Sequence, residues 1–114
     1  MRLKSILVLG PIALLAGASA SPSGAQAPGR RPLASTDIDD ITRLVMFEDR
    51  REFDATELSR ALASAHPEVR RRAAQAIARI NDKRGVALLR ARPLDADSAV
   101  AATVVFAVGQ LRDT

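Results

Sequence analysis

The chain has 114 residues, with 17 lysines and arginines against 13 aspartates and glutamates, three phenylalanines, and no cysteine, tryptophan or tyrosine. The lack of cysteine excludes disulfides, thiolate metal sites and lipid attachment to an N-terminal cysteine. Without Arg2 and Lys4 the net charge is about +2, and a mixed-charge surface with few aromatics argues against nucleic-acid binding.

The N-terminus has the layout of a secretory signal peptide. Arg2 and Lys4 form a basic start, residues 6–15 are mostly apolar, and the small residues of Ala18-Ser19-Ala20 suit a peptidase. We predict a signal peptide over residues 1–20 that is cleaved after Ala20, and hence a periplasmic or secreted bacterial protein. An uncleaved anchor and a cytoplasmic chain are the less favoured alternatives.

Two further features of this region refine that prediction. The apolar run is shorter than the ~20 residues that a transmembrane helix needs, so we expect no membrane span after cleavage. A second possible cleavage site follows Ala27, but Pro28 disfavours it. Residues 21–35 are rich in Pro, Gly and Ser and are predicted to be a disordered linker, followed by a folded domain over residues 36–114.

The first predicted helix of that domain spans residues 37–50, with Thr36 as its N-cap. Aspartates in its first turn suit the positive end of the helix dipole. Its expected core face consists of Ile38, Ile41, Leu44, Val45 and the aliphatic part of Glu48. The charged run 48–52 at its end is interpreted as a solvated turn with local ion pairs.

The second predicted helix spans residues 55–64. Asp54 and Glu57 have the spacing of a capping box, and Phe53 and Leu58 that of a hydrophobic staple. The expected buried stripe is Leu58, Ala61 and Leu62.

The third predicted helix spans residues 67–80. Pro67 suits the first helical position and Asn81 suits the left-handed residue that ends a helix. The apolar positions recur at helical spacing and comprise Val69, Ala73, Ala76, Ile77 and Ile80.

Two more helices complete the chain. A short helix over residues 83–91 has Asp82 as its cap, packs Val86, Leu88 and Leu89 inward, and is stopped by Pro93. The last helix spans residues 98–111 with Asp97 as its cap, and it carries no charge. A helix that is apolar on all sides is normally buried on all sides, so we expect a longer array that continues past Thr114. The competing hypothesis is a strand over residues 103–108, which are β-branched in part.

The third and last helices repeat one another with an offset of 31 residues. The aligned pairs are Val69 with Val100, Ala76 with Ala107, Ile77 with Val108, Ile80 with Leu111, and Asp82 with Asp113. A fixed period of ~20–50 residues is typical of stacked arrays in which each unit buries its apolar face against its neighbours. Such a unit binds other molecules more often than it catalyses reactions.

This pattern resembles HEAT-type repeats, in particular the short bacterial form found in bilin-lyase-like proteins. The resemblance covers residues 53–113: spaced leucines, then His66-Pro67-Glu68-Val69-Arg70 and an Ala-rich helix, and the same order again up to Leu111. It implies an all-α fold, a right-handed α-solenoid of about two helical hairpins, preceded by a capping helix or a degenerate half-repeat.

Two positions depart from the family pattern. His66 stands where the family prefers Asp, and Ala101 where it prefers Arg. In related arrays these Asp and Arg side chains form a ladder between neighbouring repeats. The resemblance implies that one contact of this structural ladder remains, between Arg70 and Asp97.

A second resemblance concerns residues 47–54 together with the signal peptide. They are similar to the N-terminal part of exported bacterial proteins in which HEAT-like repeats precede a cyclophilin-type prolyl isomerase domain. No part of the chain matches a cyclophilin active site, so the resemblance implies no catalytic residue here.

The sequence favours no catalytic, cofactor or metal site. His66 is the only histidine and is interpreted as a capping residue, while Asp95 and Asp97 are interpreted as the start and cap of the last helix. Arg70, Arg71 and Arg72 spread around the helix and cannot converge on one ligand.

The predicted function is therefore a non-catalytic protein–protein interaction scaffold. Its partner is another protein or further repeats of the same chain, and the candidate contacts are Arg71, Gln75 and Arg79. The alternative is a regulatory or spacer part of a larger exported enzyme, of the peptidyl-prolyl isomerase type, whose catalytic domain lies outside this chain.

Overall fold

The computed structural model describes residues 31–113, which contain five α-helices and no strand. The predicted signal peptide and most of the predicted linker lie outside the described residues. The helices are α2 (Ser35–Arg50), α3 (Ala55–Leu62), α4 (Pro67–Ile80), α5 (Arg84–Arg90) and α6 (Ser98–Arg112). None of them combines the length and the apolar character that are needed to cross a bilayer.

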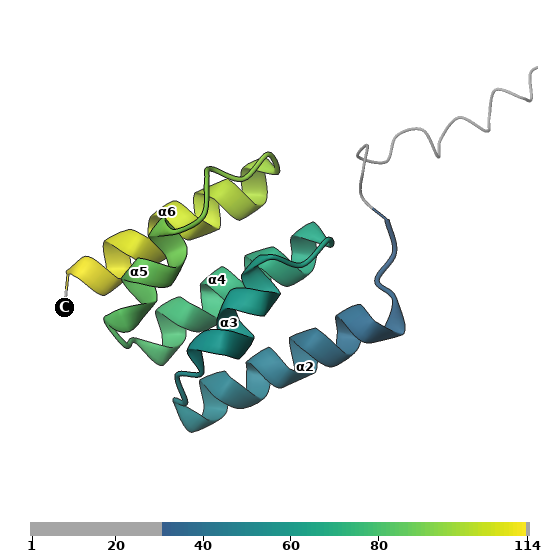
Figure 1. Ribbon diagram of the computed structural model, residues 1–114, viewed down its shortest axis with the longest axis horizontal. Helices are drawn as coiled ribbons and strands as arrows, with labels where there is room; N and C mark the ends of the chain where they lie inside the picture. Colours follow the sequence, from purple (N-terminus) through teal and green to yellow (C-terminus); the bar gives the residue numbers. More distant parts are fainter. Residues whose placement is uncertain (1–30, 114) are drawn as a thin grey trace, which may run out of the picture. The chain divides into compact units, whose positions relative to one another are not determined.

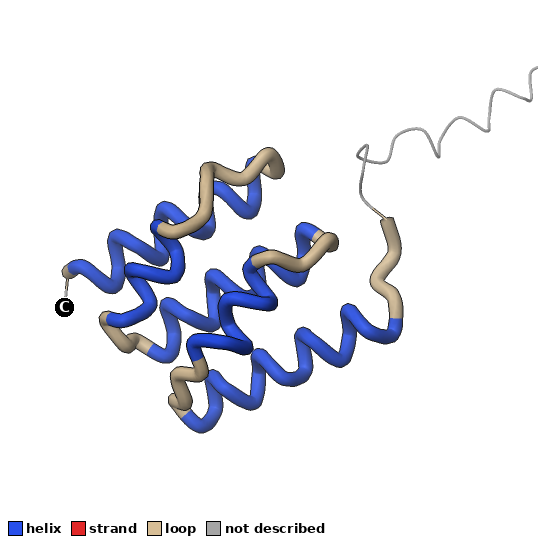
Figure 2. Tube along the Cα trace, viewed as in Figure 1, coloured by secondary structure: helices blue, strands red, loops and turns tan. Residues whose placement is uncertain are grey.

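The five helices are arranged in two layers. The long helices α2, α4 and α6 lie side by side, and the short helices α3 and α5 pack across them (Figure 1). The tube view shows the loops that join α3 to α4 and α5 to α6, so that each pair of helices forms a hairpin (Figure 2). Helix α4 contacts α2 on one side and α6 on the other. Helix α2 thus occupies the position that the second helix of a preceding hairpin would take.

The predicted boundaries of α4 are confirmed, and α6 extends one residue beyond its prediction. Residue 81 has φ 61°, so Asn81 ends α4 in the left-handed conformation as expected. The Asp97 carboxylate accepts hydrogen bonds from the amides of Ala99 and Val100 at 2.9 Å and 3.2 Å, as an N-cap does. The strand hypothesis for residues 103–108 is wrong, because the hydrogen bonding there is helical throughout.

Helix α2 begins earlier than predicted, and Thr36 is not its cap. The N-cap is Ala34, whose amide donates to Oδ2 of Asp37 at 2.9 Å. A carboxylate three residues inside the helix therefore satisfies the backbone at its start, and Thr36 lies within the first turn.

Only one of the two hydrogen bonds of the predicted capping box of α3 forms. The Asp54 carboxylate accepts from the amide of Glu57 at 3.0 Å, whereas the Glu57 carboxylate binds the Arg60 guanidinium at 2.6 Å. Helix α3 ends at Leu62, two residues before the predicted end, and α5 is one residue shorter than predicted at each end.

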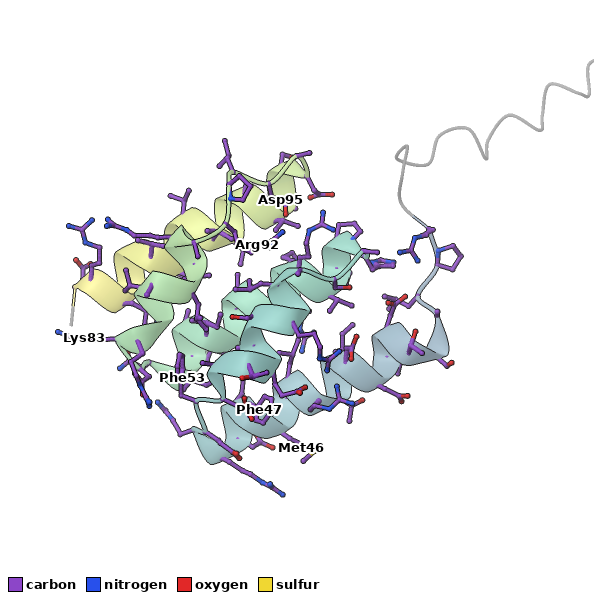
Figure 3. All side chains as sticks on the ribbon, in the orientation of Figure 1. Met46, Phe47, Phe53, Lys83, Arg92 and Asp95 are labelled. Atoms are coloured by element: carbon purple, nitrogen blue, oxygen red, sulfur yellow. The ribbon has the colours of Figure 1, made fainter. Side chains whose placement is uncertain are left out.

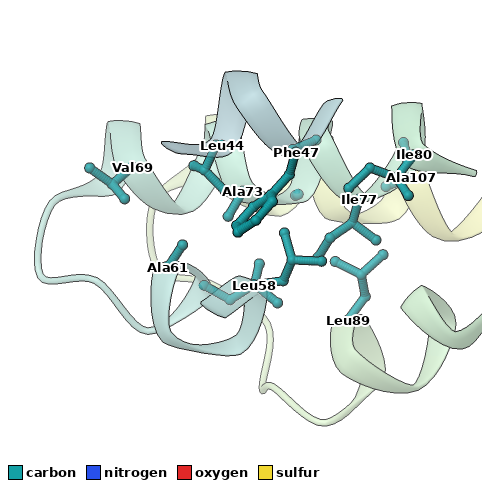
Figure 4. Close-up of a cluster of buried hydrophobic side chains, with 14 of the residues drawn as sticks. Leu44, Phe47, Leu58, Ala61, Val69, Ala73, Ile77, Ile80, Leu89 and Ala107 are labelled. Atoms are coloured by element: carbon teal, nitrogen blue, oxygen red, sulfur yellow. The ribbon is translucent and has the colours of Figure 1, made fainter. Parts of the chain in front are cut away.

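The core lies between the two layers. Leu44 and Phe47 of α2 meet Leu58 of α3, and further side chains come from α4, α5 and α6 (Figure 4). Four pairs of positions that are related by 31 residues are buried in both repeats: Val69 and Val100, Ala76 and Ala107, Ile80 and Leu111, and Leu58 and Leu89. In a fifth pair Ile77 is buried and Val108 is half-buried. The sequence repeat is therefore also a repeat of structural environment.

The core face of α2 differs from the prediction. Ile38 and Val45 were expected in the core, but both are exposed, and Phe47 is buried instead. These two residues are seven positions apart and project from one side of the helix, while α3 and α4 cover the side that carries Leu44 and Phe47. The mainly buried Glu48 does lie toward α4, where it pairs with Arg79.

A glycine permits the close approach of α5 to its neighbours. Gly85 is buried, and a Cβ atom there would overlap Cγ2 of Ile77 and lie 3.2 Å from Cδ1 of Leu111. The absence of a side chain lets α5 pack directly on α4 and α6, which fixes the position of the second hairpin.

Helix α6 is not enclosed on all sides within residues 31–113. Val105 and Phe106 have exposed fractions of 63% and 68%, and we expected such side chains to be covered by further repeats rather than by these helices. Ala107 and Leu111 on the opposite face are fully buried.

Candidate functional site

A groove runs between α4 and α6 on the face of the long-helix layer. Its volume is about 330 Å³. All three predicted partner contacts, Arg71, Gln75 and Arg79, line it from α4. They are four residues apart and therefore form one row along the helix. The opposite wall is formed by α6, through Ala102, Thr103, Phe106, Ala107 and Gln110.

The two arginines of this groove, Arg71 and Arg79, differ in how many of their nitrogens are bound by carboxylates. Arg71 donates from Nε and Nη2 to the two carboxylate oxygens of Glu68 at 3.0 Å and 2.7 Å. These hydrogen bonds raise the pKa of the Arg71 guanidinium above its ordinary value. Arg79 makes one contact with Glu48, at 3.2 Å, and its side chain is 59% exposed. Arg79 is therefore the cation that a ligand in the groove reaches more easily.

The groove offers both apolar and polar contacts. Phe106 exposes most of its ring, and the amide groups of Gln75 and Gln110 supply hydrogen-bond donors and acceptors. An exposed aromatic residue beside an arginine is a combination that is enriched in protein-binding surfaces.

Glu48 and Arg51 connect α2 with α4, a contact that the sequence did not predict. The Glu48 carboxylate binds Arg79, and Nη1 of Arg51 donates to the backbone carbonyl of Arg79 at 3.2 Å. The charged run 48–52 is thus in part a contact between helices, whereas we expected only local ion pairs. Arg51 ends α2 in the left-handed conformation, with φ 53°, and an arginine in a sequence does not signal that conformation.

The three consecutive arginines diverge, as predicted. Arg70 points toward the turn before α6, and Arg71 binds Glu68 on its own helix. Nε of Arg72 is buried and makes no hydrogen bond among the described residues. No common anion site results.

The predicted partner of Arg70 is wrong by two residues. Its Nε and Nη2 atoms donate to the carboxylate of Asp95 at 2.7 Å and 3.0 Å, and not to that of Asp97 (Figure 3 labels Asp95). The physical reason is that the Asp97 carboxylate already caps α6. Asp97 acts on Arg70 only through its charge.

His66 is a structural residue, in agreement with its interpretation as a cap. Nδ1 of its ring accepts from the amide of Glu68 at 3.0 Å, and Nε2 lies 2.8 Å from the carbonyl oxygen of Arg31. Because Nδ1 accepts from that amide, Nε2 is the ring nitrogen that donates to the Arg31 carbonyl. Across residues 31–113 no cluster of three or more metal-ligating side chains exists.

The class of protein follows from this geometry: stacked helical hairpins that share one layer of long helices form an α-solenoid. The profile of a family that is described as HEAT repeats matches residues 55–114, which is more than half of the chain. The chain belongs to the HEAT-repeat family. No curated protein and no solved structure matches it.

Proposed function

We propose that this HEAT-repeat module is a non-catalytic interaction scaffold whose partner binds in the groove between α4 and α6. The observation that carries the proposal is the single row of Arg71, Gln75 and Arg79 facing the exposed ring of Phe106. The resemblance to HEAT repeats supports binding of another protein.

The geometry favours a partner segment with an apolar side chain next to a carboxylate. Phe106 would cover the apolar group, because its exposed ring loses contact with water on binding. Arg79 would bind the carboxylate, for which Glu48 is the competing ligand at 3.2 Å. Arg71 would contribute less, since its Nε and Nη2 atoms already donate to the Glu68 carboxylate.

The test is capture of partners from an envelope extract, with Arg79→Glu and Phe106→Asp compared to the unaltered protein. The control is Lys83→Glu, which reverses an exposed charge at the start of α5. We expect both groove variants to lose the partner and the control to retain it. Retention of the same partner by all three variants would reject this groove.

Export is part of the proposal and depends on the signal-like sequence over residues 1–20. The mature protein would then begin at Ser21. Mass spectrometry of the protein from the envelope fraction tests this, and an intact Met1 in a cytoplasmic fraction would contradict it.

The second candidate function is a spacer or regulatory part of an exported enzyme of the peptidyl-prolyl isomerase type. It is supported by the resemblance of residues 47–54 to exported proteins of that organisation. Sequencing of the gene beyond the codon for Thr114 distinguishes the two, because this candidate requires a catalytic domain downstream.

A further inference from the structure

Exposed apolar side chains gather at both ends of the long-helix layer. Helix α2, at one end, exposes Ile38, Val45 and Met46. At the other end Leu94 is 79% exposed in the turn before α6, and Val105 is exposed on α6 itself. Figure 3 labels Met46 at the outer edge of α2, and Arg92 and Asp95 at the other end.

The α6 end carries a groove that is distinct from the α4–α6 groove. It lies between α5, α6 and the turn that joins them, and it has a volume of about 280 Å³. Its floor contains the buried side chains of Leu89 and Val100, and Val105 and Leu94 form its exposed margin. We call this surface the end groove.

Positive charge surrounds the end groove. Arg90 and Arg92 line it and are exposed, and Arg112 follows Val105 by seven residues on the same side of α6. Among the described residues no carboxylate lies within 4.0 Å of these three guanidinium groups. Asp95 also lines the groove, but Arg70 holds its carboxylate.

The opposite end is acidic. Helix α2 carries five carboxylates and two arginines. Asp37 pairs with Arg31, Asp40 with Arg43 and Glu48 with Arg79, whereas two carboxylates, Asp39 and Asp49, and one arginine, Arg50, are exposed. The two ends therefore differ in sign, and both present apolar side chains.

We propose that the end groove of one copy of this chain binds the outer face of α2 of a second copy. Two end grooves facing each other would oppose their arginines, which costs binding energy. An acidic amphipathic helix avoids that repulsion, and α2 is such a helix. Since α2 already lies beside α4 in the layer, α2 of a second copy beside α6 would continue the same layer.

This contact joins two different surfaces, so it leaves a free end on each copy. Interfaces of this kind build open chains unless the rotation between copies closes a ring. Association should therefore increase with protein concentration beyond a dimer. It should also weaken with added salt, because exposed charges contribute to it.

The experiment uses sedimentation of the purified chain over an about 100-fold range of concentration, since mass action governs assembly. Two double variants are compared: Arg90→Glu with Arg92→Glu, and Asp39→Lys with Asp49→Lys. We expect each alone to associate at least about tenfold more weakly than the unaltered chain. An equimolar mixture should associate again, because the acidic end groove of one variant meets the basic α2 of the other.

Lys83→Glu is the control, and circular dichroism verifies that every variant is folded. A monomer at all concentrations would overturn the proposal. Association of both double variants at the level of the unaltered chain would also overturn it. If reversal of Arg90 and Arg92 abolished association while reversal of Asp39 and Asp49 had no effect, α2 would be rejected as the occupant, and another surface of the second copy would be indicated.

Discussion

Arg70 and Asp95 join the two turns that precede the long helices of the repeats. The guanidinium of Arg70 binds both carboxylate oxygens of Asp95 at 2.7 Å and 3.0 Å, and its Nη1 donates to the carbonyl of Ser64 at 2.9 Å. One side chain thus connects the turn before α4 with the turn before α6. The pair is mostly shielded, with 17% and 14% of the two side chains exposed.

Asp95→Asn should destabilise the protein by about 1–3 kcal/mol, because it leaves a shielded guanidinium without its charged acceptor. Arg70→Lys should have a similar effect, since an ammonium cannot bind both oxygens in the same plane. Urea unfolding of the two single variants and the double variant measures the interaction free energy between Arg70 and Asp95. Stronger coupling of Arg70 to Asp97 than to Asp95 would contradict the assignment.

The same pair should make stability depend on pH. Hydrogen bonds from Arg70 hold the pKa of Asp95 below its ordinary value of 3.8. A carboxyl whose pKa is lower in the folded state stabilises that state above its unfolded pKa. This contribution is lost as the pH falls through the lowered folded value.

Asp95→Asn should therefore lose less stability than the unaltered protein on acidification below pH 3.8, the ordinary value of the group. The pKa of Asp82 is also lowered, to about 2, by hydrogen bonds from Arg84. That effect is common to both proteins and cancels in the comparison. If the free energies of unfolding of the two proteins fell in parallel as the pH is lowered, Asp95 would not titrate as we predict.

Two glycines should respond in opposite directions to alanine. Gly85→Ala should destabilise the protein by about 1–3 kcal/mol, because the new methyl group would overlap Ile77. Gly109→Ala should stabilise it by about 0.5–1 kcal/mol, since the added Cβ meets no atom within 4 Å beyond the adjoining residues and backbone of its own helix, and alanine favours the helix. Thermal unfolding measures both. A stabilising Gly85→Ala would mean that α5 lies farther from α4.

His66 should be replaceable by a different N-cap residue. His66→Ala should cost about 1 kcal/mol, because the amide of Glu68 loses its acceptor. His66→Asp restores an acceptor and should regain most of that loss, although the contact with the Arg31 carbonyl is removed. Chemical denaturation of the three proteins provides the comparison. Equal stability of the alanine and aspartate variants would exclude a capping role.

The repeats could be predicted well because their signals are local. Pro67 and Asn81 fix the ends of α4 through backbone geometry alone, and Asp97 caps α6 through atoms two and three residues away. The row of Arg71, Gln75 and Arg79 could be predicted for the same reason, because it requires only helical periodicity.

The remaining features depend on contacts between distant segments. Helix α2 has apolar residues on two sides, so the choice of Phe47 over Ile38 and Val45 for the core is made by the position of α3 and α4. The pairing of Arg70 with Asp95 depends on the path of the turn before α6, which periodicity does not describe. Phe106 could not be assigned to the groove before the position of α6 beside α4 was known.

Helix α4 is enclosed between α2 and α6, as the shared helix of a stacked array. Amide hydrogen exchange followed residue by residue tests this most directly, because protection reflects the free energy of opening each segment. We predict the slowest exchange in residues 73–77 of α4, with faster exchange in α2 and α6. Exchange in α4 as fast as in those outer helices would contradict the stacked arrangement.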